Sequence, residues 1–264
     1  MNRIDNLFKD RKFAHIFYLT VGEFPIEEEL EIIKAVIESG GDCLELGIPF
    51  SDPLADGATI QEAMQEALRR GTSLKDVLKL VERIRESSDI PLLLMGYYNP
   101  FYQYGIERIC RDAKERGVDG FIIPDLPPEE AKELMENAKR YDLRTVFLLA
   151  PTSNEERYRI VGSATTGFIY YVSVKGTTGE REELPRDIEE KVPRIKEITG
   201  KPVVVGFGIS KREHIDWLRR FADGAVTGSA LLRILKEHRD DKERMLTEVR
   251  KFVSDLCKDD KIES

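Results

Sequence analysis

Two carboxylates are the residues best suited to do chemistry, and both lie in the stretch LELGIPFSDPLADG, residues 44–57. Glu45 sits between two leucines in a predicted buried strand. Side chains alternate between the faces of a strand, so the leucines share one face and Glu45 points to the other. If the leucines pack against helices, Glu45 points into the interior, where desolvation raises the pKa of a carboxyl and suits it to proton transfer near neutral pH. A buried glutamate held by a cation or by hydrogen bonds is the structural alternative.

Asp56 lies further along the same stretch, in a loop that contains two prolines and ends in glycine. An aspartate before a glycine is also a common turn residue, so its type alone does not indicate chemistry. Its closeness to Glu45 favours a functional interpretation, because acid–base pairs are often two carboxylates held in different environments.

Three loops rich in glycine and small residues form a second candidate feature. They are SVKGTTG (173–179), GFGIS (206–210) and TGSAL (227–231), and each follows a predicted strand. The last two lead into predicted helices, whose N-terminal N–H groups and dipoles attract anions. We therefore predict a phosphate site at these loops, with ordinary connecting turns as the alternative. The longer segment 173–186 predicts a lid over the site, with a solvated loop as the alternative.

The elements that must position these residues form a repeating pattern. Eight β-rich runs alternate with amphipathic segments of helical period, which predicts a (β/α)8 barrel with its chemistry at the carboxyl ends of the strands. A doubly wound open sheet is the alternative, although no G-x-G-x-x-G follows the first strand. We predict one domain over residues 1–264, with extra helices at 2–12 and at about 240–256. The predicted strands are 15–20, 42–46, 91–95, 119–123, 144–149, 167–172, 201–205 and 223–228.

Composition excludes several classes of protein. The chain has 264 residues, of which 34% are charged, and its net charge of −8 disfavours nucleic-acid binding. No apolar run approaches the ~18 residues of a membrane span, and the N-terminal segment has no apolar signal core. Cys43, Cys110 and Cys257 are far apart and odd in number, which predicts no disulfide framework and a reducing, cytoplasmic location. The three histidines are scattered and form no metal-binding motif, so no metal is expected.

The stretch LELGIPFSDPLADG, followed by TIQ, resembles the signature of the tryptophan synthase alpha subunit family. LLLMGYYNPFYQYG, DGFIIPDLPPEE, GFIYYVSVKGTTG, VVVGFGIS and DGAVTGSAL resemble the family in the same order, so the likeness covers nearly the whole chain. Ala58 departs from the pattern, because the family commonly has proline there. This difference is expected to loosen the loop that carries Asp56.

The resemblance implies a (β/α)8 barrel that cleaves indole-3-glycerol phosphate to indole and glyceraldehyde 3-phosphate. By motif match, Glu45 and Asp56 correspond to the two catalytic acids of the family. Tyr18 and Tyr97 correspond to walls of the indole pocket, and Tyr170 to a tyrosine near the reacting glycerol. Thr178 corresponds to a threonine that meets the Asp56 loop on closure. The phosphate cradle would consist of Gly179, Gly206, Phe207, Gly208, Gly228 and Ser229.

The resemblance also implies a partner. The family's beta subunit carries pyridoxal phosphate and receives the indole through a tunnel, which implies an alpha2-beta2 tetramer and no cofactor in this chain. We expect the partner to dock at the mouth of the barrel, near Pro53 and near Asn99 and Pro100.

Three rival functions remain to be tested. A Schiff-base aldolase would need an active lysine, for which Lys175 has the place in sequence but a polar loop around it. A module that only activates a partner has no need of the acid pair. A different phosphate-binding barrel, which isomerises or cyclises its substrate, shares the glycine-rich loops but not the stretch around Glu45 and Asp56.

Overall fold

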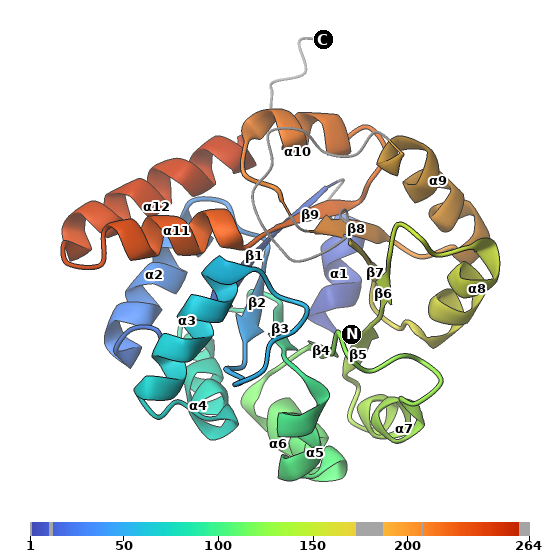
Figure 1. Ribbon diagram of the computed structural model, residues 1–264, viewed down its shortest axis with the longest axis horizontal. Coiled ribbons are helices and arrows are strands. Elements are labelled where there is room, and N and C mark those ends of the chain that lie inside the picture. The colour runs from blue at the N-terminus through green and yellow to red at the C-terminus, as the bar shows by residue number, and fades with distance from the viewer. Residues whose placement is uncertain (1, 11–12, 173–186, 207, 259–264) are drawn as a thin grey trace.

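The computed structural model describes residues 2–10, 13–172, 187–206 and 208–258. Figure 1 looks along a barrel, with strands at the centre and helices in a ring around them. The strands are β1 (Ala14–Thr20), β2 (Cys43–Gly47), β3 (Leu92–Met95), β4 (Gly120–Ile122), β5 (Arg144–Val146), β6 (Leu148–Leu149), β7 (Ile169–Val172), β8 (Val203–Gly206) and β9 (Gly224–Thr227). The helices are α1 (Arg3–Asp10), α2 (Ile26–Glu38), α3 (Ala58–Arg69), α4 (Leu74–Arg85), α5 (Tyr98–Tyr104), α6 (Ile106–Arg116), α7 (Lys132–Arg140), α8 (Glu155–Ala164), α9 (Ile188–Thr199), α10 (Arg212–Leu218), α11 (Ser229–Glu237) and α12 (Lys242–Cys257).

The sheet closes on itself. Its nine described strands follow the order β5-β4-β3-β2-β1-β9-β8-β7-β6. All neighbouring pairs are parallel. The two ends of this order, β5 and β6, are consecutive pieces of one run that is interrupted at Phe147. Counting them as one strand gives eight barrel positions, so the predicted (β/α)8 barrel is confirmed and the open doubly wound sheet is wrong.

Strand β2 shows how the residue pattern produces the two surfaces of the barrel wall. Leu44 and Leu46 are completely buried, as expected for a wall packed against an outer ring of helices. Glu45 is equally buried but lines an interior pocket. The predicted inward direction of Glu45 is therefore what the structure shows.

Aspartates at the amino ends of three strands tie neighbouring strands together. Each one accepts a backbone N–H from the start of an adjacent strand, which adds a charge-assisted hydrogen bond to the sheet. The pairs are Asp42 Oδ2 with His15 N (2.9 Å), Asp119 Oδ2 with Leu92 N (2.9 Å) and Asp223 Oδ2 with Val203 N (2.8 Å).

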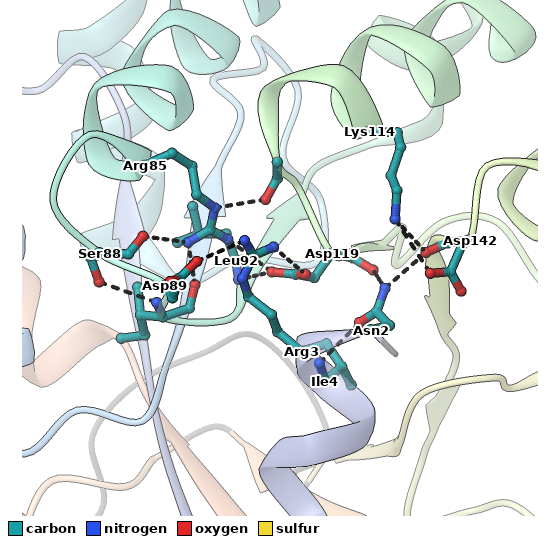
Figure 2. Close-up of polar contacts among 12 residues, drawn as sticks. Asn2, Arg3, Ile4, Arg85, Ser88, Asp89, Leu92, Lys114, Asp119 and Asp142 are labelled. Carbon is teal, nitrogen blue, oxygen red and sulfur yellow. Dashed lines mark hydrogen bonds and ion pairs between the residues drawn. The ribbon is translucent and has the colours of Figure 1, made fainter.

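Helix α1 is fastened across the amino ends of the strands, as Figure 2 shows. Asn2 Nδ2 donates to the carbonyl oxygens of Asp119 and Asp142, each at 2.9 Å. Arg3 Nη1 lies 3.2 Å from Asp119 Oδ1, and Arg85 Nη2 lies 2.9 Å from Asp119 Oδ2. The predicted N-terminal helix thus exists and occupies this end of the barrel, which leaves the carboxyl end for the site.

The predicted C-terminal helix is α12, which packs against α2 and α11. None of the three cysteines forms a disulfide. Within the described ranges, no helix is long and apolar enough to cross a membrane.

Candidate active site

A pocket opens at the carboxyl ends of the strands, where the barrel fold predicts chemistry. It is formed by inward side chains of strands that lie far apart in the sequence and by the loops that follow these strands. Its lining consists of Tyr18, Glu45, Asp56, Ile60, Met95, Tyr170, Gly208, Ile209, Val226, Gly228, Ser229 and Ala230.

Glu45 is the most unusual group in this lining. Its side chain has no exposed area, and neither carboxyl oxygen has a hydrogen-bond partner among the described residues. Desolvation by burial raises the pKa of Glu45 to about 8. The carboxyl is therefore mostly protonated at neutral pH, and its proton is not committed to any described acceptor. A group of this kind is equipped to act as a general acid.

Asp56 is also buried, at 3% exposure, but it has a partner. The hydroxyl of Tyr97 donates to Asp56 Oδ2 at 2.7 Å and accepts from the backbone N–H of Ala55 at 2.9 Å. Burial raises the pKa of Asp56 to about 6, while the Tyr97 hydrogen bond lowers it. Asp56 is therefore mostly ionised at neutral pH, in contrast to Glu45.

Helix α3 holds the loop that carries Asp56 through hydrogen bonds. Gln61 Nε2 donates to the carbonyl oxygen of Asp56 at 2.8 Å and reaches that of Pro53 at 3.4 Å. The backbone N–H of Asp56 also donates to Pro53 O at 3.1 Å. The glutamine of the TIQ triplet thus fastens the loop to the first turn of α3.

The side chains of Tyr18 and Tyr170 extend over the end of a neighbouring strand and line the pocket. A Cβ at Gly47 would lie 2.2 Å from the Tyr18 hydroxyl, and a Cβ at Gly206 would lie 2.2 Å from the Tyr170 hydroxyl. Glycine at these strand ends therefore makes room for the phenol rings. Burial, followed by the charges of Asp56 and Glu45, raises the pKa of Tyr18, and the same groups act on Tyr170. Both tyrosines stay neutral and lie near both acids.

Another part of the pocket lining consists of small residues and the start of a helix. Gly208 has a φ of +84°, a backbone conformation that favours glycine. Gly228 precedes the first residue of α11, Ser229, so this helix points its N-terminus at the pocket. No lysine or arginine occurs in the described lining. An anion here would be held by backbone N–H groups and the helix dipole.

Most of the predicted site residues lie together. The pocket lining contains seven of them: Tyr18, Glu45, Asp56, Tyr170, Gly208, Gly228 and Ser229. Tyr97 is not part of that lining and contacts Asp56 instead, with its ring stacked on Phe50 at 5.1 Å between centroids. Gly206 makes room for Tyr170 rather than lining the pocket. TGSAL leads directly into α11, whereas GFGIS ends before α10, which begins at Arg212. Thr178, Gly179, Phe207, Lys175 and the predicted lid at 173–186 lie outside the described residues.

The apolar part of the lining consists of Ile60, Met95, Ile209, Val226 and Ala230, and none of these five was predicted as a site residue, although Ile209 and Ala230 lie within the predicted loops GFGIS and TGSAL. Met95 could have been found as the last residue of a predicted strand. Ile60 could have been found in the TIQ triplet, one turn after Asp56. Nothing in their residue types separates them from the many other core residues.

The fold is a (β/α)8 barrel, and its pocket holds a pair of acids at the carboxyl ends of the strands, where barrel enzymes have their active sites. A family model described as "Tryptophan synthase alpha chain" matches residues 4–261. The chain belongs to the tryptophan synthase alpha chain family, and so to the lyases of tryptophan biosynthesis.

Curated relatives agree over almost the full length. The tryptophan synthase alpha chain of Thermoanaerobacter sp. (strain X514) is 45% identical over 97% of this chain and 98% of the relative. That of Aquifex aeolicus is 50% identical over 89% of this chain and 92% of the relative.

Solved structures show the same fold. A structure of the tryptophan synthase a2b2 complex from Pyrococcus furiosus contains a chain with a TM-score of 0.85 and 43% identity. The match covers 92% of this chain and 97% of that chain. The alpha subunit from Legionella pneumophila has a TM-score of 0.89 at 34% identity, over 97% of each chain.

Proposed function

We propose that this protein cleaves indole-3-glycerol phosphate to indole and glyceraldehyde 3-phosphate by acid–base catalysis with two carboxylates. The observation that carries this proposal is the pairing, in one pocket, of a buried Glu45 that has no hydrogen-bond partner among the described residues with a hydrogen-bonded Asp56. Membership of the tryptophan synthase alpha chain family supports the choice of substrate.

The bond to be broken joins C3 of the indole ring to a carbon of the glycerol chain. The ring is a poor leaving group until C3 is protonated, because the electron pair of the broken bond then flows into an indolenine. Glu45, protonated at neutral pH through its raised pKa, delivers that proton. The resulting carboxylate then removes the proton of the glycerol hydroxyl next to the ring. As the C–C bond breaks, this oxygen becomes the aldehyde and Glu45 is again protonated.

Asp56 acts on the other end of the indole ring system. Positive charge grows on the ring nitrogen when C3 is protonated. An ionised Asp56 accepts a hydrogen bond from the indole N–H and stabilises that charge. The two acids keep separate roles because, in the described part of the chain, Asp56 has a donor that favours its ionised form, the Tyr97 hydroxyl, and Glu45 has none.

The rest of the lining suits the two ends of this substrate. Ile60, Met95 and the ring of Tyr18 supply apolar surface for the indole. Gly208, Gly228 and Ser229 leave backbone accessible to the phosphate, with the N-terminus of α11 behind it. A neutral Glu45 also avoids adding negative charge to a pocket that must accept a phosphate.

The partner follows from the same family. We infer that a beta subunit carrying pyridoxal phosphate docks over the pocket mouth, in an alpha2-beta2 assembly like that named for the Pyrococcus furiosus structure. Leu54, next to the Asp56 loop, is 87% exposed, and Tyr102 is 59% exposed. These two exposed apolar side chains are the first candidates for contacts with the partner, since aromatic and other apolar side chains fill the cores of such interfaces.

The first test is indole release from indole-3-glycerol phosphate by the chain alone at high enzyme concentration, and then with a beta subunit added. Glu45→Gln is expected to lose activity by about 10² or more, because Gln cannot transfer the proton. Glu29→Gln is the matched control, since Glu29 is also buried with a pKa raised to about 7 but does not line the pocket. Retained turnover in Glu45→Gln would reject the mechanism. No turnover in the unaltered chain, with or without a beta subunit, would reject the reaction.

A further inference from the structure

A second cluster of charged side chains lies outside the pocket, where three segments meet. These segments are the loop after β1 (residues 21–25), helix α3 and the C-terminal end of α11. The cluster lines a cavity of its own. Its charged members are Glu23, Glu62, Glu66, Arg69, Lys236 and Arg239.

Arg239 lies at the centre of this cluster. Its Nη2 is 3.4 Å from Glu23 Oε1, and its Nη1 is 3.8 Å from Glu66 Oε1 on α3. Its guanidinium also lies over the ring of Phe24, 5.3 Å from the centroid. A second link, between Lys236 and Glu62 at 2.5 Å, joins α11 to α3 again. Arg239 therefore connects the loop after β1 with α3. Lys236, about one turn earlier in the chain, connects α11 with α3.

Glu23 is the member most dependent on this arrangement. Its side chain is only 6% exposed, and its Oε2 has no hydrogen-bond partner in the described part of the chain. Burial raises the pKa of Glu23 to about 7, and the charge of Arg239 lowers it. A buried carboxylate without its cation is strongly destabilised, so removing Arg239 affects more than one surface ion pair.

Each of the three segments is continuous in sequence with part of the pocket lining. Strand β1 carries Tyr18, the residues just before α3 include Asp56, and α11 begins with Ser229 at the anion side. Helix α3 packs against β1 and α11. The relative placement of Asp56 and Ser229 therefore depends on how α3 sits against α11.

We propose that Arg239 and Glu23 are positioning residues for the cleavage reaction, holding α3 so that Asp56 keeps its place relative to the anion side of the pocket. This proposal rests on the proposed function for its catalytic consequence. The Asp56 loop is exposed at Ser51, Asp52 and Leu54. Of the contacts described above for Asp56, that with Gln61 comes from α3 itself, so the placement of Asp56 depends on α3 as well as on Tyr97.

The test compares Arg239→Met with the unaltered chain. Methionine keeps an aliphatic stem over Phe24 but removes the charge. Arg250→Met is the matched control, because Arg250 lies on α12 and its ion pair within the described ranges, with Glu38, is long at 3.9 Å. Two quantities are measured: hydrogen–deuterium exchange of the 51–69 segment and kcat for indole release. For Arg239→Met we expect exchange to rise and kcat to fall by about three- to thirtyfold, the usual range for coupling at a distance. Arg239→Lys should recover part of both, and Arg250→Met should change neither.

Glu23→Gln provides a second variant in case Arg239→Met folds poorly, because it removes the charge without changing the shape. It should shift exchange and kcat in the same direction. Unchanged exchange in both variants would overturn the proposal. Faster exchange with unchanged kcat would overturn the positioning role. If the unaltered chain releases no indole with or without a beta subunit, the proposed function fails, and the exchange measurement still decides whether the cluster holds α3.

Discussion

Glu45 and Asp56 differ in their hydrogen bonds, and this difference supports the separate roles proposed for them. Both carboxylates are buried, and burial raises the pKa of each. Among the described residues, Asp56 receives a hydrogen bond from the Tyr97 hydroxyl and Glu45 receives none. Such a bond favours the ionised form, so two similar side chains in one pocket are held as an acid and as an anion. Tyr97 therefore favours the ionised form of Asp56, although Tyr97 does not line the pocket.

Replacing Tyr97 by phenylalanine should shift the pH dependence of the reaction. The profile of kcat/KM for the unaltered chain is expected to be bell-shaped, with limbs near pH 6 for Asp56 and near pH 8 for Glu45. The Tyr97 hydroxyl stabilises the ionised carboxylate, so removing it raises the pKa of Asp56. The acid limb should then move upward by about one pH unit, while the basic limb stays in place.

The control for this experiment is Tyr102→Phe, because Tyr102 is a nearby tyrosine that is 59% exposed. Its profile should match that of the unaltered chain. An acid limb that stays in place in Tyr97→Phe would show that the Tyr97 hydroxyl does not govern the ionisation of Asp56.

At the scale of elements, the carboxyl ends of the strands and the starts of the next helices form the site together. Strand β2 ends at Gly47, which gives the Tyr18 ring its space, and β8 ends at Gly206, which does the same for Tyr170. Helices α3 and α11 begin at the pocket and place Asp56 and Ser229 there. The first residue of α3, Ala58, is exposed and lies in the first turn of the helix.

Proline at this position should stabilise the loop. The first position of a helix favours proline, because its fixed φ suits the helix and its missing N–H costs no helical hydrogen bond. Ala58→Pro is expected to raise the free energy of unfolding by about 0.4–1 kcal/mol, chiefly by restricting the unfolded chain. Denaturant unfolding measures this. A decrease in stability would mean that the backbone at Ala58 does not suit proline.

At the scale of the whole molecule, the two ends of the barrel have different tasks. The amino end is covered by α1 and held by the hydrogen bonds around Asp119 (Figure 2). The carboxyl end holds the pocket and exposes Leu54 and Tyr102. Stability and chemistry are thus placed at opposite ends of the strands, as is usual in this fold.

Leu54→Asp should weaken association with a beta subunit by about tenfold or more, because it places a charge on an apolar contact surface. Gel filtration and titration calorimetry with the partner measure this. Leu68→Asp is the control, since Leu68 is a partly exposed leucine in the last turn of α3, at the end away from the pocket. Equal affinity for the two variants would remove Leu54 from the proposed interface.

The barrel could be predicted from sequence because its signals are local and repeated. Each strand run and each amphipathic helix depends on the spacing of nearby residues, and eight repeats reinforce one another. The same local pattern placed Glu45 inward, since a strand has only two faces. Motif likeness placed Asp56, Tyr18 and Tyr170 at the site, and the pocket contains all three.

The remaining features depend on residues that are distant in sequence. The run interrupted at Phe147 closes the barrel, because β5 pairs with β4 and β6 pairs with β7. The Tyr97 hydroxyl on Asp56 is a second contact between separate parts of the chain. The cluster of Glu23, Glu66 and Arg239 is a third. No local period or motif encodes such contacts. The acidity of a carboxyl depends on its surroundings, so the sequence could indicate which acids matter, but only the folded barrel determines which of them keeps its proton.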